Sequence, residues 1–175
     1  MTRIHSSLGE SIPKTKMAYA WLYTCRGIPQ LYYGSEILMK GISNPDGWVR
    51  LDFPGGWDGD KKNAFTEIGL SSDEADFLHY VQALGAYRTK SSALKTGNMM
   101  QYIPEDGLYV YFRYDNNQTI MCVMNTDNKA RNLNLSKYAE RTNGFNGGKN
   151  IISGNQIGQA FSVASMSMHI IELTK

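Results

Sequence analysis

The chain has 175 residues, of which 42% are hydrophobic, and its formal net charge at pH 7 is +2. These values are typical of a globular protein with a packed core and exclude a disordered chain. The Lys and Arg residues are scattered along the sequence, which argues against nucleic acid or a membrane surface as a partner, because both require a concentrated basic face.

The sequence carries no signal for a membrane, a metal or a cofactor. No apolar run approaches the roughly 18 residues of a membrane span, and the N-terminal "MTRIHSSLGESIPKTK" lacks the apolar region of a signal peptide. Cys25 and Cys122 lie far apart, and the histidines are isolated from one another. We therefore expect free thiols, no metal site and no cofactor.

A helix is predicted over residues 11–25, "SIPKTKMAYAWLYTC". Ser11 can cap it, Pro13 suits its first turn, and Arg26–Gly27 closes it. Tyr and Ala residues make the faces beside its apolar stripe unusually apolar, so we expect the helix to be covered.

A short apolar run over residues 28–33 then predicts a strand that is buried on both faces, as in a parallel sheet. A helix followed at once by such a strand is one αβ step of a repeating βα fold. One step of this kind cannot bury itself, because a parallel strand needs a neighbour on each side.

Residues 40–70 predict a long loop, and residues 72–88 predict a second helix. The loop is rich in Gly, Pro and Asp, and loops of this length within compact domains are usually functional. Ser71 and Glu74 match a capping box at the start of the helix.

From Asn98 onward the hydrophobic pattern changes to a period of two. Seven short runs alternate with turns such as Asp106–Gly107, Asn116–Asn117 and Gly147–Gly148. The runs are "NMMQYIP", "LYVYFRYD", "QTIMCVMNT", "ARNLNL", "KNIIS", "QAFSV" and "MSMHIIEL". Such a pattern favours an antiparallel β-sandwich over residues 96–175, preceded by a distinct part over residues 1–95.

Two stretches resemble the α-amylase family of glycoside hydrolases. "RGIPQLYYGSEI", which starts at Arg26, is similar to the string at the eighth strand of the family's catalytic barrel, except that Ser35 stands where Asp or Thr is frequent. "DFPGGWDGDKKNAFT", which starts at Asp52, resembles a loop of the neopullulanase and cyclomaltodextrinase branch. A third stretch, "MTRI", resembles the residues that come after the Asn-His-Asp motif of the seventh strand.

The resemblance implies an α+β fold: the last αβ unit of a (β/α)8 barrel, followed by the sandwich. It also implies the C-terminal part of a retaining hydrolase of starch, maltooligosaccharides or pullulan. Two catalytic carboxyls about 5–5.5 Å apart are needed for that mechanism, and the family's three catalytic carboxylates would precede Met1. The chain alone is then expected to be inactive. The alternatives are a non-catalytic α-glucan-binding module and a purely structural domain.

The resemblance places three residues at the lining of an active site: Arg3, Tyr33 and Glu36. Arg3 matches the arginine after the family's histidine–aspartate motif and would support the active-site carboxylates. Its alternative is a mobile terminal arginine. Tyr33 and Glu36 belong to the eighth-strand signature, and Glu36 could instead cap a helix or lie on the surface.

The loop supplies the predicted substrate-binding residues Arg50, Asp52, Phe53 and Trp57. They combine a forked donor, an acceptor and two aromatic faces, which suits an α-glucan oligosaccharide as a partner. The alternative is that Phe53 and Trp57 only plug the loop onto the barrel. An Asp-Gly-Asp stretch at residues 58–60 is too poor in oxygen ligands to predict calcium.

A barrel remnant would leave large apolar faces open, so we also expect self-association. The sequence leaves the compartment open; the periplasm or the cell exterior would suit a bacterial starch-degrading parent.

Overall fold

A computed structural model describes residues 2–175 of the chain. Two compact units are present: the residues up to Thr15 with Pro29–Gln82, and Lys16–Ile28 with Ala83–Lys175. The helices α2 (Ile12–Thr24) and α3 (Ser72–Lys90) each contribute residues to both units and lie within two residues of the ranges predicted for helices. None of the helices described is long and apolar enough to cross a membrane.

The first unit alternates short helical segments with irregular loops. Besides the starts of α2 and α3, its segments are α1 (Ile4–Ser7), η1 (Ser35–Ile37) and η2 (Asp46–Arg50). A small core of the first unit is formed by Ile37 of η1, Ala64 of the loop and Leu78 of α3. The capping box at α3 is formed: the Ser71 N–H donates to Glu74 Oε2 at 2.8 Å, and the Glu74 N–H donates to Ser71 Oγ at 3.2 Å.

The strand predicted over residues 28–33 is absent. These residues are irregular, Ile28 is 95% exposed, and Tyr33 is 39% exposed. A strand is stabilised by ladder hydrogen bonds from its neighbours, and no part of the chain between residues 2 and 175 pairs with this segment. The run of apolar residues is present, but the described residues contain no strand that could pair with it.

The second unit contains the strands of the predicted sandwich. All their pairings are antiparallel, in a six-stranded sheet of order β1-β2-β3-β8-β5-β6 and a two-stranded sheet of β4 and β7. The strands are β1 (Asn98–Gln101), β2 (Leu108–Tyr114), β3 (Thr119–Asn125), β4 (Arg131–Asn134), β5 (Gly147–Asn150), β6 (Gln156–Ile157), β7 (Ala160–Val163) and β8 (Ser167–Thr174). Six of the seven runs seen in the sequence coincide with one strand each, and β6 is additional. The run at residues 149–153 overlaps β5 only at Lys149 and Asn150, and the turn predicted at Gly147–Gly148 was wrong, because these two glycines pair with Thr174 and Leu173 of β8.

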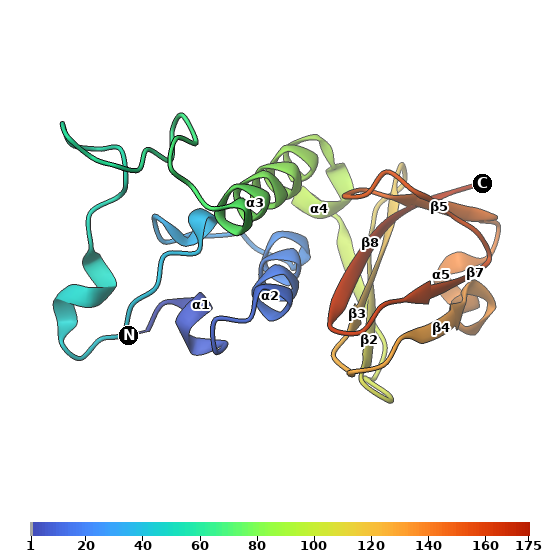
Figure 1. The fold of residues 1–175 in the computed structure, drawn as a ribbon. Helices are drawn as coiled ribbons and strands as arrows, with labels where there is room; N and C mark the ends of the chain where they lie inside the picture. The colour runs from blue at the N-terminus through green and yellow to red at the C-terminus, as the bar shows by residue number, and fades with distance from the viewer. Residues whose placement is uncertain (1) are drawn as a thin grey trace. The chain divides into compact units, whose positions relative to one another are not determined.

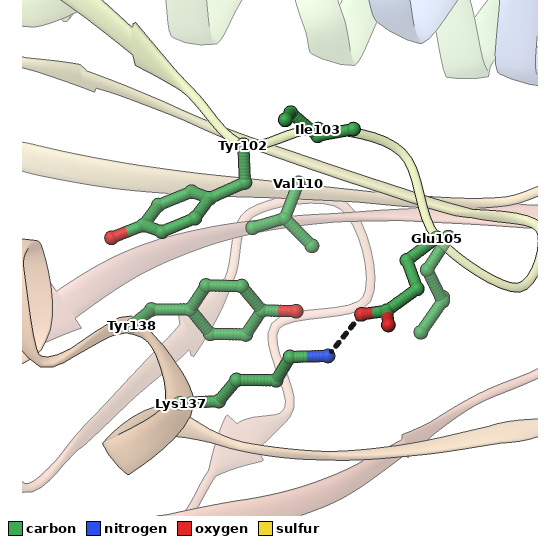
Figure 2. Close-up of a pocket in the computed structure, with 7 residues that line it drawn as sticks. Tyr102, Ile103, Glu105, Val110, Lys137 and Tyr138 are labelled. Atoms are coloured by element: carbon green, nitrogen blue, oxygen red, sulfur yellow. Dashed lines mark hydrogen bonds and ion pairs between the residues drawn. The ribbon is translucent and has the colours of Figure 1, made fainter.

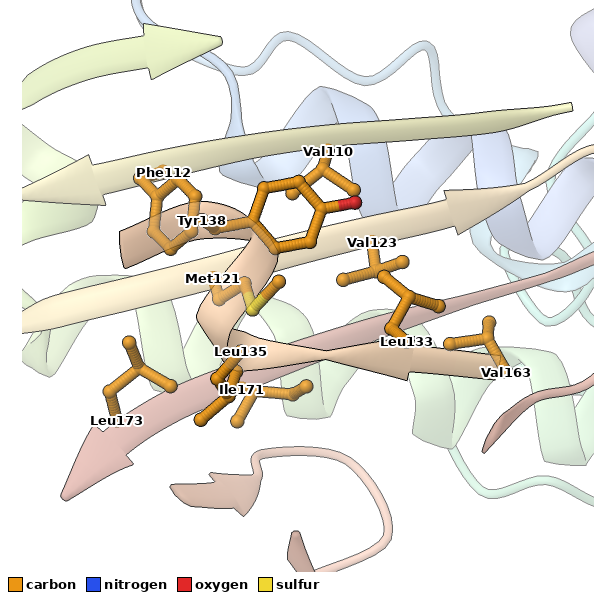
Figure 3. Packing of buried hydrophobic residues seen from close by; sticks show 10 residues of the cluster. All are labelled: Val110, Phe112, Met121, Val123, Leu133, Leu135, Tyr138, Val163, Ile171 and Leu173. Atoms are coloured by element: carbon orange, nitrogen blue, oxygen red, sulfur yellow. The ribbon is translucent and has the colours of Figure 1, made fainter. Parts of the chain in front are cut away.

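The core of the second unit lies between the two sheets (Figure 1). Alternate residues of β2, β3 and β8 point toward β4, β7 and the short helix η3 (Leu135–Tyr138), which the helix α5 (Ala139–Thr142) follows. Figure 3 shows ten of these side chains interleaved: Val110, Phe112, Met121, Val123, Leu133, Leu135, Tyr138, Val163, Ile171 and Leu173. This is the antiparallel sandwich that the period-two pattern predicted.

The opposite face of the larger sheet packs against the ends of α2 and α3 and against α4 (Ser92–Thr96). Arg113, on β2, is 1% exposed and donates to the carbonyls of Thr24 and Cys25 at 2.8 and 2.7 Å. Arg88, near the end of α3, donates to the Tyr23 carbonyl at 2.7 Å. The two guanidinium groups thus bind the C-terminal end of α2, where carbonyl groups lack helical partners.

Candidate functional site

Arg3 is one of the three residues predicted from the sequence to line the site, and it contacts another of them, Tyr33. Its side chain is 4% exposed, so it is not a mobile terminal arginine. Nη1 donates to the Tyr33 carbonyl at 2.7 Å, and the guanidinium carbon lies 4.8 and 5.0 Å from the ring centroids of Tyr32 and Tyr33. Nε and Nη2 are buried and have no hydrogen-bond partner among residues 2–175. A buried guanidinium in this state presents two free donors.

Tyr33 joins Arg3 to the loop. Its hydroxyl donates to the Leu51 carbonyl at 2.9 Å, so Tyr33 contacts both Arg3 and the loop. Loss of hydration and the neighbouring Tyr32 hydroxyl raise the pKa of Tyr33, and the Asp52 carboxylate acts in the same direction. Tyr33 therefore stays protonated at neutral pH and can act as a hydrogen-bond donor.

Glu36 lies on η1, directly after a turn that requires glycine. Gly34 has φ of +75°, and a Cβ at that position would lie 2.0 Å from Met39 Sδ. The turn thus fixes where η1 begins and where Glu36 stands, half-buried beside the buried Ser35. Within residues 2–175, no hydrogen bond or ion pair joins Glu36 to Arg3 or Tyr33, and its lining role stays a prediction.

The two aromatic residues of the loop have different environments. Phe53 packs on the small core of the first unit, with its ring centroid 5.2 Å from that of Phe65. Trp57 is 67% exposed. The plug interpretation therefore fits Phe53, whereas the Trp57 ring is open to a ligand.

Asp60 holds the turn that presents Trp57. Its Oδ2 accepts the N–H of Gly55 at 2.7 Å and the N–H of Trp57 at 3.2 Å. Gly55 has φ of +96°, and a Cβ there would lie 2.6 Å from the Asn63 side chain. This role of Asp60 was not predicted from the sequence, although an aspartate three residues after an exposed aromatic in a Gly-rich turn is a signal for it.

The charged residues of the loop are exposed. Arg50 pairs with Asp46 at 3.2 Å, and both side chains are 66% exposed. Asp52 is exposed and lies close enough to Tyr33 to affect its pKa. The structure thus places Asp52 near Tyr33 and leaves Arg50 in a surface ion pair.

The second unit matches a known domain family. The model of the cyclo-malto-dextrinase C-terminal domain matches residues 99–172, which begin in β1 and end in β8. The matched range covers 74 of the 175 residues of the chain. The family model therefore matches the sandwich. The predicted resemblance to the cyclomaltodextrinase branch is confirmed for this part of the chain.

Relatives extend the likeness beyond the C-terminal domain. The cyclomaltodextrinase of Geobacillus thermopakistaniensis is 27% identical over 133 residues, which are 75% of this chain and 20% of that protein. The maltogenic alpha-amylase of Bacillus acidopullulyticus is 26% identical over 145 residues, which are 80% of this chain and 22% of that protein. The chain thus spans about a fifth of the length of these two curated relatives.

A solved structure shows the same fold. The alpha-amylase of Geobacillus thermoleovorans, in complex with acarbose, superposes with a TM-score of 0.71 at 20% identity. The match covers 94% of this chain and 34% of that one. The chain therefore has the fold of the corresponding part of that enzyme.

Proposed function

We propose that this chain is the C-terminal part of a retaining α-glucan hydrolase, and that its first unit belongs to the wall of the catalytic site. The observation that carries the proposal is Arg3. A guanidinium that is buried, with Nε and Nη2 unpartnered, needs an acceptor, because an unpaired buried charge is costly. A carboxylate suits the two donors best.

The position of Arg3 agrees with this acceptor. In the family that "MTRI" resembles, the preceding residues end in a histidine and an aspartate, and the catalytic carboxylates would precede Met1. The mechanism requires two carboxyls across the scissile bond. Alone, the chain should therefore not cleave α-glucosidic bonds, and its role would be to support carboxylates provided by the rest of the enzyme.

Sequencing the coding DNA upstream of the Met1 codon tests this proposal directly. We expect an open reading frame that continues upstream and ends in Asn-His-Asp before Met1. A stop codon in frame, preceded by no such motif, would contradict it. A matched assay on maltoheptaose and pullulan should show no hydrolysis by the 175-residue chain.

A second candidate function, α-glucan binding without hydrolysis, is favoured by Trp57. The turn held by Asp60 presents Trp57, which is 67% exposed, and sugar rings stack on aromatic faces of this kind. We expect maltoheptaose to change the tryptophan fluorescence of the chain, and Trp57→Ala to remove most of the change.

Trp48→Ala is the matched control, because Trp48 is 57% exposed on the neighbouring segment η2. A titration that leaves the fluorescence flat would exclude the binding role and leave a structural role for this loop. An equal loss in both variants would argue against a specific role for Trp57.

A further inference from the structure

The second unit contains a pocket that is formed by different residues from those of the loop. It has a volume of about 260 Å³ and lies where the β1–β2 hairpin approaches η3 (Figure 2). This volume is just below the roughly 300–1,000 Å³ of pockets for drug-sized ligands, so it suits a smaller group. The residues that line it are Tyr102, Ile103, Glu105, Leu108, Val110, Lys137 and Tyr138.

One wall of the pocket is a tight hairpin turn. Glu105 and Leu108 exchange backbone hydrogen bonds at 3.0 and 2.8 Å around Asp106 and Gly107, both of which have positive φ. The Gly107 carbonyl also accepts the Thr126 N–H at 2.8 Å. Asp-Gly at such a turn matches the twist of the two strands. The backbone that carries Glu105 is therefore held in place before any ligand arrives.

The opposite wall is the short helix η3. The Asn134 side chain accepts the Ser136 N–H at 2.9 Å and thus caps this helix. Tyr138 is 4% exposed, and its ring centroid lies 4.9 Å from that of Tyr102 in an edge-on arrangement. In Figure 2 the Tyr138 hydroxyl points toward Glu105 and Lys137, and the Val110 side chain lies above the Tyr138 ring.

A charged pair closes one side of the pocket. Lys137 Nζ lies 2.8 Å from Glu105 Oε2, and the two side chains are 62% and 67% exposed. Such an exposed pair contributes little to stability, so a ligand can replace it at small cost. It offers carboxylate acceptors and an ammonium donor beside an apolar floor.

We propose that this pocket binds a single pyranose ring at the end of an α-glucan. A pyranose has C–H faces that match Tyr102 and Val110, and hydroxyl groups at its edge that match the Glu105–Lys137 pair. A purely apolar occupant would leave that pair unused. That the ring comes from an α-glucan rests on the function proposed above.

The test is a titration of the ¹⁵N-labelled full chain with maltotriose, followed by amide chemical shifts. We expect shifts at residues 102–108 and 136–138 that saturate in the millimolar range. The double variant Glu105→Gln/Lys137→Gln should reduce the affinity at least tenfold, because it removes both charges and shortens the side chain at position 137. Absence of shifts at these residues, or shifts that survive unchanged in the double variant, would overturn the proposal.

Three controls separate binding in the pocket from other effects. Lys40→Gln removes another exposed ion pair, that between Lys40 and Glu10, and should leave the shifts unchanged. Glycerol at a matched hydroxyl concentration should produce none, since it has no ring; equal shifts with glycerol would overturn the proposal. Trp57→Ala reports on the loop: pocket shifts that persist in this variant support an independent site, whereas their loss would overturn it.

Discussion

Two buried arginines of this chain have different hydrogen-bond environments. Arg3 leaves two guanidinium nitrogens without a partner among residues 2–175, whereas Arg113 uses Nη1, Nη2 and Nε to donate to four carbonyl groups. A buried polar group is usually satisfied within its own structure unless another molecule or segment satisfies it. Arg113 is therefore a structural residue, whereas the free guanidinium nitrogens of Arg3 are the basis of the function proposed above.

Arg113→Lys should destabilise the second unit by about 3 kcal/mol. Lysine keeps the charge but lacks the planar fork, so carbonyls such as those of Thr24 and Gly97 would lose their donor, at about 1–3 kcal/mol for each buried group. Urea denaturation should show a lower midpoint with an unchanged slope. In the control Arg50→Lys, where the side chain is 66% exposed, the change should stay within about 0.5 kcal/mol. Equal midpoints for both variants would contradict the prediction.

His169 should make the stability of the second unit dependent on pH. Burial lowers its pKa, and its Nδ1 has no partner among the residues described. The unfolded chain, with a histidine pKa of about 6.5, therefore binds more protons than the folded chain once the pH falls below that value. The free energy of unfolding therefore has its full value above about pH 6.5 and decreases as the pH falls toward the pKa of His169 in the folded chain.

The measurement is the urea midpoint at pH 7.5 and pH 5.5. His169→Phe should reduce the loss between these two values, because phenylalanine does not titrate and can replace the ring that stacks on Phe161. His79→Gln is the control, because the His79 side chain is 58% exposed. A pH dependence that is the same in all variants would exclude His169 as its source.

At the scale of elements, the sequence predicted what local patterns determine. The capping box of Ser71 and Glu74 and the period-two runs of β2, β3 and β8 depend on residues a few positions apart, and they formed as expected. The two-residue strand β6 and the helices η3 and α5 were missed, because they are too short to show a period. The strand over 28–33 was wrong, because a strand depends on partners that its own sequence does not contain.

The same limit applies to the candidate sites. The loop around Trp57 could be predicted from the sequence as a binding site, because its aromatic residues and its Gly-rich turn are adjacent in the chain. The pocket in the sandwich was not, because Glu105 and Lys137 are separated by 32 residues and meet only through the fold. Arg3 was predicted as a site residue from the family resemblance alone, and only the structure shows that its side chain is buried.

At the scale of the whole chain, the two units differ in how their backbones are held. The second unit has a ladder in which β3 is paired on both sides, with β2 and β8. The strand-like pairing in the first unit is an isolated bridge, Asn63–Ile68, among the residues described. The free energy of local opening should therefore be lower in the first unit.

Amide hydrogen exchange tests this difference. We expect residues 29–70 to exchange much faster than residues 119–125, because few of their amides belong to a cooperative ladder. Comparable protection in both ranges would show that the first unit is covered, for instance by a second copy of the chain. Measurement at two protein concentrations separates that case, since only self-association depends on concentration.

The contacts that Arg88 of α3 and Arg113 of β2 make with the C-terminal end of α2 should depend little on pH and ionic strength. Arg88 and Arg113 bind carbonyl oxygens there, and neither is in an ion pair with a carboxylate within residues 2–175. Carbonyl groups do not take up protons in the range where carboxylates do, and buried charge–dipole contacts are screened little by ions. These arginine–carbonyl hydrogen bonds should therefore persist at a low pH and a high salt concentration that would weaken a salt bridge between arginine and aspartate.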